Sequence, residues 1–345
     1  MASPTSTTSS SPPTARIDLH VHMVSNGGRG ITSPHAEGAD RGWLRLGSPW
    51  HRWLARFMLR QLGVPAQALD SDLDSAYSQL LLAHIRDSPS IDSVVLLAHE
   101  QVYEPDGNLR PDLGTMYVPN DTVLDLARRH PEFLAGVSIH PARADAIDEL
   151  ERCATAGAVL MKCLPNCQNI DPSDARYRPF WKRMAELKLP LLAHTGGEHT
   201  VQIVEPAYAD PKLLRLPLEC GVTVVAAHCA TRSGVFDRDY FDDWRRMLPE
   251  FPHLYGDISA LVSLNRCGHL RDCLAPEILP RIVHGSDFPV PVLGHRLWAQ
   301  RWISTADFNR CRKIQNPLER DWQYKRALGF PESLLERPAT LLRLV

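Results

Sequence analysis

A repeated alternation of short apolar runs with longer amphipathic stretches constrains the fold of this chain more than any other feature. From Ile17 onward, each apolar run is followed by a polar or glycine-containing turn, and then by apolar residues spaced three and four apart. This alternation is expected of parallel strand–helix units. The eight apolar runs are residues 17–22, 93–98, 134–139, 158–162, 189–194, 222–228, 254–258 and 281–284.

The composition of these runs indicates strands that are buried on both faces. Segments such as VVLLA, PLLAH and VTVVAAH are almost continuously apolar, as parallel strands covered by helices should be. An open doubly wound sheet is the competing architecture, but no glycine-rich phosphate-binding fingerprint follows the first run. We therefore predict an α/β fold of the (β/α)₈ TIM-barrel type, with helices at 121–130, 144–156, 177–187 and 240–248.

A length of 345 residues is compatible with one large barrel domain. We predict a flexible Ser/Thr/Pro-rich tail at 1–15 and a single domain at 16–345, in which 291–345 forms closing helices. About 70 residues separate the first two runs, far more than a usual connection, so 24–75 should hold an insertion. Its tryptophans favour either a lid over the barrel mouth or a packing or oligomer contact.

Net charge and cysteine content limit the classes of binding partner and the cellular compartment that we expect. A formal net charge of −2 offers no field that would attract nucleic acid or anionic lipid, and no apolar run approaches the roughly 20 residues of a membrane span. The eight scattered cysteines suit reduced thiols. We expect a cytoplasmic protein, a homodimer, that acts on a small molecule and binds neither nucleic acid nor membrane.

The first apolar run ends in a pair of histidines with chelating geometry. His20 and His22 are separated by one residue, so on a regular strand both imidazoles project from the same face. Neutral imidazole is a preferred ligand of Zn²⁺. Three more ligand-type residues, His194, His228 and Asp287, occur at or just after the ends of other runs. Because the carboxyl ends of barrel strands converge on one mouth, these five residues predict a metal site.

Lys162 ends the fourth run and places a cation at the same mouth. Three interpretations remain open. It is carbamylated and bridges two metals, it binds an anionic substrate group as an ammonium, or it points outward.

These residues lie in motifs that resemble the amidohydrolase superfamily. The motifs are IDLHVH (17–22), VLMKCLP (159–165), LLAHTG (191–196), VVAAHCA (224–230), YGDIS (255–259) and VHGSDFP (283–289). Within the superfamily, the pattern is most similar to amidohydrolase family 2, the amidohydrolase-related branch that includes the aminocarboxymuconate semialdehyde decarboxylases. The C-terminal NPLERDWQYKRALGFP also resembles that branch.

The resemblance implies two alternative arrangements of the metal site. In the mononuclear one, His20, His22, His194 and Asp287 are ligands, and His228 is a nearby acid, base or oxygen-orienting group. In the binuclear one, His194 and His228 hold a second ion, and carbamylated Lys162 bridges the two. We favour the binuclear arrangement slightly. The metal is expected to be Zn, with Mn or Fe as alternatives.

A divalent ion lowers the pKa of bound water to roughly 7 and polarises a carbonyl, and Asp287 can then act as general base and acid. We therefore predict a hydrolase that cleaves an amide, lactone or related ester. The alternative is a non-oxidative decarboxylase of a carboxylated aromatic or unsaturated acid. A third hypothesis, a non-catalytic barrel, is disfavoured because every ligand-type residue is present.

Arg232, just after His228, is a candidate for binding a substrate carboxylate, although a solvated loop arginine is the commoner case. Asp18 should share the face of His20 and either orient an imidazole or serve in packing. His140 and His284 are interpreted as structural. Residues 99 and 100, a histidine and a glutamate, are candidates for lining the mouth.

Overall fold

The computed structural model describes residues 15–28, 41–263 and 265–344. Nearly all of the predicted tail, 1–15, and part of the predicted insertion, 24–75, lie outside the described residues. The division into domains stays a prediction.

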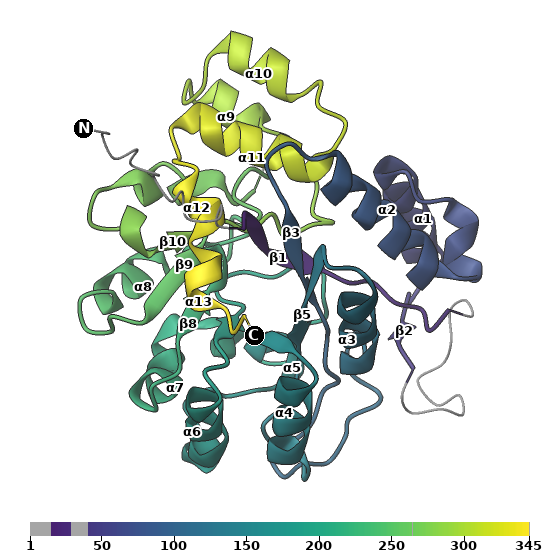
Figure 1. The fold of residues 1–345 in the computed structure, drawn as a ribbon, viewed down its shortest axis with the longest axis vertical. Helices are drawn as coiled ribbons and strands as arrows, with labels where there is room; N and C mark the ends of the chain where they lie inside the picture. The colour runs from purple at the N-terminus through teal and green to yellow at the C-terminus, as the bar shows by residue number, and fades with distance from the viewer. Residues whose placement is uncertain (1–14, 29–40, 264, 345) are drawn as a thin grey trace, which may run out of the picture.

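Eight parallel strands form a barrel enclosed by helices, which confirms the predicted fold class (Figure 1). The strands follow one another around the sheet in the order β1-β3-β5-β6-β7-β8-β9-β10. The ring closes where the backbone N–H groups of Leu19 and His22 donate to His284 O (3.2 Å) and Phe288 O (2.9 Å). The strand bounds are β1 (Ile17–His22), β3 (Ser93–Leu97), β5 (Phe133–Val137), β6 (Ala158–Cys163), β7 (Leu191–Ala193), β8 (Val224–Ala226), β9 (Leu254–Asp257) and β10 (Ile282–Val283).

The strands separate two apolar layers, which explains their continuous apolar runs. Within β8, Val225 packs inside the barrel, whereas Val224 packs against the surrounding helices. Burying both faces is characteristic of parallel sheets covered by helices. The interior layer contains Ile17, Leu19, Val95, Leu97, Val159, Leu160, Leu192, Val225, Ala227 and Val283.

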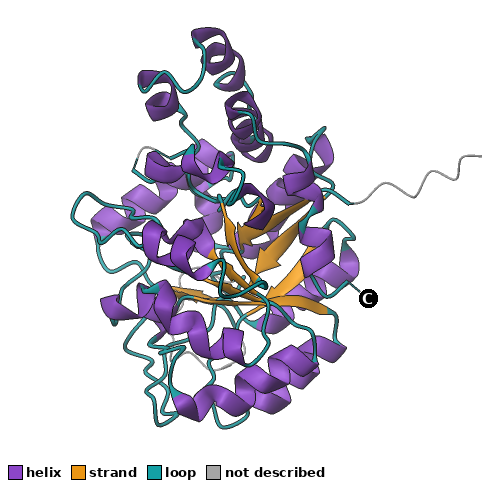
Figure 2. Ribbon diagram, turned by 90° about the vertical axis from the view of Figure 1, so that its left-hand side faces the viewer, coloured by secondary structure: helices purple, strands orange, loops and turns teal. Residues whose placement is uncertain are grey.

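The predicted helices correspond to α3, α4, α6 and α8, and Figure 2 shows helices on all sides of the strands. Hydrophobic residues on one face of each helix pack onto the barrel, as their three- and four-residue spacing predicts. The helices that follow the barrel strands are α2 (Leu73–Asp87), α3 (Asn120–Arg129), α4 (Ala146–Thr155), α6 (Arg178–Glu186), α7 (Arg215–Glu219) and α8 (Phe241–Met247).

The long connection after β1 contains α1 (Pro49–Leu62) and the short strand β2 (Trp43–Leu44), which pairs antiparallel with β4 (Met116–Tyr117). On α1, the rings of Trp50 and Trp53 stack with centroids 4.9 Å apart, and both side chains are exposed. The predicted lid or contact role of this segment stays a prediction.

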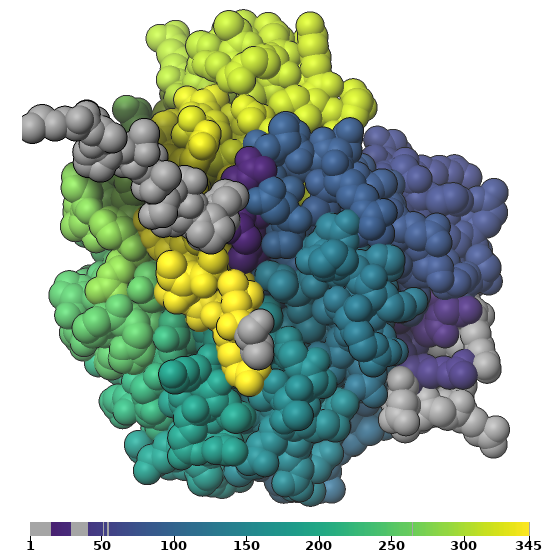
Figure 3. Space-filling model, viewed as in Figure 1, coloured from purple at the N-terminus to yellow at the C-terminus, as the bar shows by residue number. Residues whose placement is uncertain are grey.

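The C-terminal segment folds into helices, and its last residues cover one end of the barrel. Leu342 packs into the interior apolar layer, and the backbone N–H of Arg343 donates to Val159 O (3.1 Å) at the start of β6. Figure 3 shows this segment across the middle of the face that holds the amino ends of the strands. The helices are α9 (His295–Ala299), α10 (Thr305–Cys311), α11 (Pro317–Leu328), α12 (Ser333–Glu336) and α13 (Pro338–Leu341).

All eight cysteines are free. Among the described residues, no helix combines the length and apolar character needed to cross a lipid bilayer.

Candidate metal centre

A bulge in β1 directs both histidines of the first motif into the barrel mouth. Asp18 pairs with Val94 and Val21 with Leu96, so Leu19 and His20 together lie opposite one residue of β3. In a regular strand Leu19 and His20 would point to opposite faces. The extra residue of the bulge breaks this alternation, because a bulge re-aims the side chains that follow it. Leu19 therefore packs inside the barrel and His20 faces the mouth, while Asp18, opposite the outward-facing Val94, lies on the helix side.

This geometry changes the predicted role of Asp18. The sequence-based expectation placed Asp18 on the face of His20, where it would either orient an imidazole or serve in packing. Instead its carboxylate accepts a hydrogen bond from the backbone N–H of His20 (3.1 Å). A regular strand period fails here because the bulge cannot be recognised in the pattern of apolar residues.

Three potential ligand atoms from β1 and the segment after β10 converge at one point. His20 Nε2 and His22 Nε2 lie 3.1 Å apart, and Asp287 Oδ1 lies 3.3 Å and 3.2 Å from them. Ligands about 2.1 Å from one tetrahedral ion lie about 3.4 Å from each other. The three atoms therefore fit a shared divalent cation.

His194 and His228 follow β7 and β8 and border the same point. Their ring centroids are 5.1 Å apart, and that of His228 is 5.3 Å from that of His20. His194 Nε2 is buried and has no hydrogen-bond partner among the described residues, as expected of a nitrogen that awaits a ligand. Burial lowers the pKa of both imidazoles, so both are neutral at pH 7.

Lys162 points into this cluster rather than outward. Its Nζ lies 2.9 Å from His20 Nε2, and its side chain is fully buried. Burial lowers the pKa of the Lys162 ammonium despite the nearby carboxylates of Asp287 and Asp257. Two of the three interpretations of this residue, a bridging carbamate and an anion-binding ammonium, agree with this position.

The pKa of Asp287 is shifted in the opposite direction from that of an ordinary buried carboxyl. Burial alone would raise it, but the surrounding imidazoles and Lys162 lower it to about 2. Asp287 is consequently ionised, with Oδ2 lying 4.0 Å from His228 Nε2. Its φ of 65° is unusual for a residue with a Cβ, and such conformations are concentrated at functional sites.

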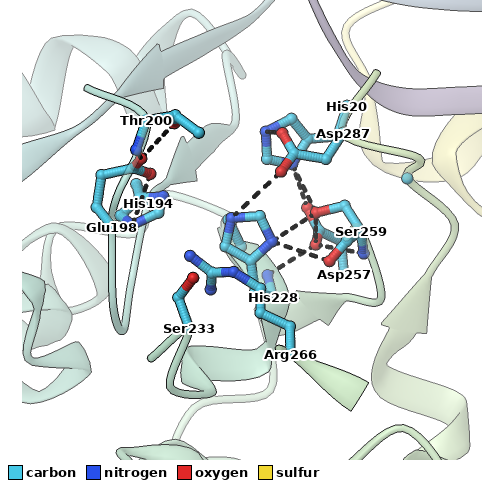
Figure 4. A network of polar contacts seen from close by, with 12 residues as sticks. His20, His194, Glu198, Thr200, His228, Ser233, Asp257, Ser259, Arg266 and Asp287 are labelled. Atoms are coloured by element: carbon cyan, nitrogen blue, oxygen red, sulfur yellow. Dashed lines mark hydrogen bonds and ion pairs between the residues drawn. The ribbon is translucent and has the colours of Figure 1, made fainter. Parts of the chain in front are cut away.

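Asp257 was assigned no role from the sequence, yet it organises the site. Its Oδ2 lies 2.8 Å from His20 Nδ1, and its Oδ1 accepts hydrogen bonds from the backbone N–H of His228 (2.8 Å) and from Ser259 Oγ (2.5 Å) (Figure 4). The proton on His20 Nδ1 then leaves Nε2 free to bind a cation, as is common for metal-bound histidines. The signal was available, because Asp257 lies near the end of an apolar run within the YGDIS motif.

Glu198 and Arg266 were also missed. Glu198 Oε1 accepts hydrogen bonds from the backbone N–H groups of His199 (2.8 Å) and Thr200 (2.5 Å), and Oε2 lies 3.6 Å from His194 Nε2. Arg266 is 6% exposed and donates to the carbonyls of Thr231 and Gly197. In Figure 4 its guanidinium lies beside His228. Both residues lie in loops, where no periodic pattern marks them.

The remaining sequence-based candidates take various positions. Arg232 is half-exposed, with its guanidinium 3.8 Å from Asp239. His140 is buried and hydrogen-bonded to Gln168 O (3.0 Å), in accordance with a structural role. His99 is buried, and burial lowers its pKa to about 3, with the charges of His22 and Lys162 adding to the effect.

Comparisons with known proteins agree with the fold and with the motifs. The family model described as amidohydrolase matches residues 17–324. A search of curated proteins by sequence found no match. Among solved structures, an uncharacterised TIM-barrel protein from Bordetella bronchiseptica is similar with a TM-score of 0.57 and 17% identity, over 94% of this chain and 99% of that chain.

Two further solved structures are named for different reactions. A 5-carboxyvanillate decarboxylase from Sphingomonas paucimobilis has a TM-score of 0.53 and 13% identity, over 96% of this chain and 100% of that chain. A proposed 2-pyrone-4,6-dicarboxylic acid hydrolase from Pseudomonas putida has a TM-score of 0.50 and 15% identity, over 92% and 98%. At these identities the similarity shows the barrel fold alone.

Proposed function

Because the chain belongs to the amidohydrolase family, we propose that it is a metal-dependent hydrolase that cleaves an amide, lactone or related ester bond of a small organic molecule. His20, His22 and Asp287 would hold the cation, joined by His194 in a mononuclear site, or by Lys162 with a second ion on His194 and His228. Bound there, a divalent cation supplies Lewis acidity that activates water and polarises a carbonyl.

The place of Lys162 is the observation that carries the hydrolase assignment. Its Nζ lies 2.9 Å from His20 Nε2, on a strand three places around the barrel from β1. A lysine that close to a ligand nitrogen supports a modified, ligating side chain. Addition of CO₂ to the neutral amine forms the N–C bond of a carbamate and releases one proton, which gives an anionic bridging group.

Asp287 and His228 are placed to move protons. The Ser259 carbonyl, 2.9 Å from His228 Nδ1, can only accept, so Nδ1 carries the proton and Nε2 keeps a lone pair. His228 Nε2 is thus suited to accept a proton or to bind a cation. Asp287, ionised and 4.0 Å away, would take the proton of the attacking water and pass it to the leaving group.

Arg266 supports a substrate that carries an anionic group. No carboxylate among the described residues lies within 4.0 Å of its guanidinium, although the side chain is 6% exposed. The charges of Glu198 and Asp287 act on Arg266 from beyond that distance, so its burial is compensated without a direct ion pair. A substrate carboxylate beside His228 would supply a direct partner through paired hydrogen bonds.

The same observation favours one alternative, non-oxidative decarboxylation of a carboxylated aromatic or unsaturated acid. There the C–CO₂ bond breaks, CO₂ leaves, and a proton delivered by Asp287 or His228 takes its place on carbon. The two reactions differ in their products, which makes them separable by experiment.

The test is a product assay on the Zn²⁺-loaded protein with carboxylated lactones, N-acyl amino acids and hydroxybenzoates. We expect acid release, measured by pH-stat, without CO₂. Asp287→Asn should lower kcat by about 10²–10⁴-fold, the usual contribution of a general acid–base. CO₂ release from a hydroxybenzoate would establish the alternative, and turnover of no compound by the metal-loaded protein would contradict both.

Substitution of the buried arginine tests the anionic substrate. Arg266→Met should raise KM about tenfold to hundredfold, because a hydrogen bond to a charged group contributes about 1.5–3 kcal/mol. Arg232→Met is the matched control, since Arg232 is half-exposed and already lies near Asp239, and its KM should change little. Equal effects of the two substitutions, or no effect of the first, would argue against this role of Arg266.

A further inference from the structure

A buried polar cluster lies on the helix side of the barrel, behind the proposed metal ligands. It consists of Asp18 of β1, His284 after β10, and Asp321 and Lys325 of α11, none of them more than 1% exposed. Its members are absent from the proposed chemistry. Two of them, Lys325 and Asp18, nevertheless form hydrogen bonds with the backbone of the segments that carry the proposed ligands.

Lys325 binds the segment that leads to Asp287. Its Nζ donates a hydrogen bond to Gly285 O (2.8 Å) and forms an ion pair with Asp321 one helical turn earlier. Gly285 is itself confined, because a Cβ at this position would lie 2.7 Å from the Cβ of His20. The lysine thus fixes the backbone at a point where β1 and the segment after β10 touch.

Asp18, which lies on β1, connects β1 to the segment after β10. One carboxylate oxygen accepts from the backbone N–H of His20 (3.1 Å) and from that of Ser286 (2.9 Å). His20 is a proposed ligand, and Ser286 directly precedes another, Asp287. The Asp18 carboxylate therefore bridges the two ligand-bearing backbones, in addition to their direct hydrogen bond from the backbone N–H of Asp287 to His20 O (2.8 Å).

A contribution to folding stability does not by itself explain why charged side chains are buried in this cluster. Replacing a buried ion pair with apolar residues of similar size is often neutral or stabilising. The cluster also leaves polar atoms unsatisfied, since Asp18 Oδ2, Asp321 Oδ1 and both ring nitrogens of His284 have no hydrogen-bond partner among the described residues. What the charges do provide is directional hydrogen bonds to the ligand-bearing backbone.

We propose that Lys325 and Asp18 are positioning residues, which hold residues 285–287 against β1 and thereby fix Asp287 beside the imidazoles of His20 and His22. Helix α11, distant in sequence from the ligands, thus determines the geometry of the site. The expected effect on metal affinity rests on the proposed function. The conformational order of the backbone at residues 285–287 can be measured without any metal.

The main variant is Asp321→Leu/Lys325→Met, in which both partners of the ion pair are replaced together so that neither is left without the other. We expect it to fold, to bind Zn²⁺ about 10–100-fold more weakly, and to exchange the backbone amides of Ser286 and Asp287 faster in hydrogen–deuterium exchange of the metal-free protein. Loss of an outer partner of a metal ligand commonly has an effect of this size.

Two further comparisons separate positioning from general stability. Asp18→Ala should act like the double variant, whereas Asp18→Asn keeps an accepting oxygen and should retain most of the Zn²⁺ affinity. Leu318→Ala, a cavity on the same helix, should lower the Tm but leave Zn²⁺ affinity and the exchange of residues 286–287 unchanged.

Wild-type exchange at residues 286–287 in the double variant would overturn the proposal, as would equal effects of Leu318→Ala. If the wild-type protein itself binds no Zn²⁺, Mn²⁺ or Fe²⁺, the proposed function fails. The exchange experiment would still decide whether Lys325 orders the segment.

Discussion

From the end of β9, Asp257 orients the imidazole of His20 and holds the backbone of His228. One of its oxygens lies 2.8 Å from His20 Nδ1, and the other accepts from the backbone N–H of His228 (2.8 Å). Because it engages Nδ1, the Nε2 atom of His20 faces the other ligands. A carboxylate behind a histidine therefore decides which nitrogen is available for a cation.

His140 links the pH of the solution to the stability of the fold. Its Nε2–H donates to Gln168 O (3.0 Å) and its Nδ1 accepts from the backbone N–H of Ala142 (3.1 Å), so the buried ring is neutral. Burial lowers its pKa to about 4, whereas in the unfolded chain it is about 6.5. The unfolded chain takes up the proton first, so this stability is present above pH 6.5 and is lost as the pH falls towards 4.

The loss attributable to His140 should reach about 3 kcal/mol. We expect urea unfolding of the wild type to show a larger decrease in the free energy of unfolding between pH 7 and pH 4.5 than His140→Gln, which carries no titrating group. If both proteins lose the same free energy over this range, His140 is not the cause.

At the scale of elements, the barrel interior beside β5 has no room for an additional methyl group. Gly136 faces inward, and a Cβ there would lie 2.5 Å from Leu97 Cδ2 and 2.9 Å from Val95 Cγ1. We expect Gly136→Ala to lower the free energy of unfolding by about 1–3 kcal/mol through overpacking. Gly268→Ala is the control, because a Cβ at Gly268 has no atom within 4 Å. Chemical denaturation would show equal effects if interior packing were not the cause.

The strands and helices were predictable from the sequence where their burial requires a recognisable pattern of apolar residues. All eight apolar runs overlap barrel strands, because two-sided burial requires continuous apolar residues. The side-chain direction within β1 was not predictable, since the bulge at Leu19 and His20 leaves no mark on composition. The predicted face of Asp18 was therefore wrong. The prediction that His20 and His22 share a face did not depend on the bulge, because both residues follow Leu19.

Site residues on loops escaped prediction for a different reason. Arg232 and Arg266 are both loop arginines near a strand end, and only the folded backbone decides which one is buried. Glu198 likewise reaches His194 through a turn held by backbone N–H groups. Loop conformation depends on such contacts rather than on a hydrophobic period, so it is not encoded in a pattern that can be recognised locally.

At the scale of the whole molecule, a bound cation would connect distant parts of the ring. The proposed ligands lie on β1 and after β7, β8 and β10, so metal binding would stabilise the folded barrel by mass action. At a free Zn²⁺ concentration of 100 Kd this contributes about 2.7 kcal/mol. A chelator should therefore lower the Tm by about 3–6 °C in a domain of this size.

Differential scanning fluorimetry with and without EDTA measures this shift, and added Zn²⁺ should reverse it. A His22→Ala/Asp287→Ala variant should have a Tm that is insensitive to both. A chelator effect of equal size on the variant would place the stabilising ion elsewhere in the molecule.

Leu342 and α13 close the barrel at the amino ends of its strands. With that end covered, the proposed substrate and its product would both pass through the mouth at the carboxyl ends of the strands. Product would then have to leave before the next substrate molecule binds, so slow product release would limit kcat.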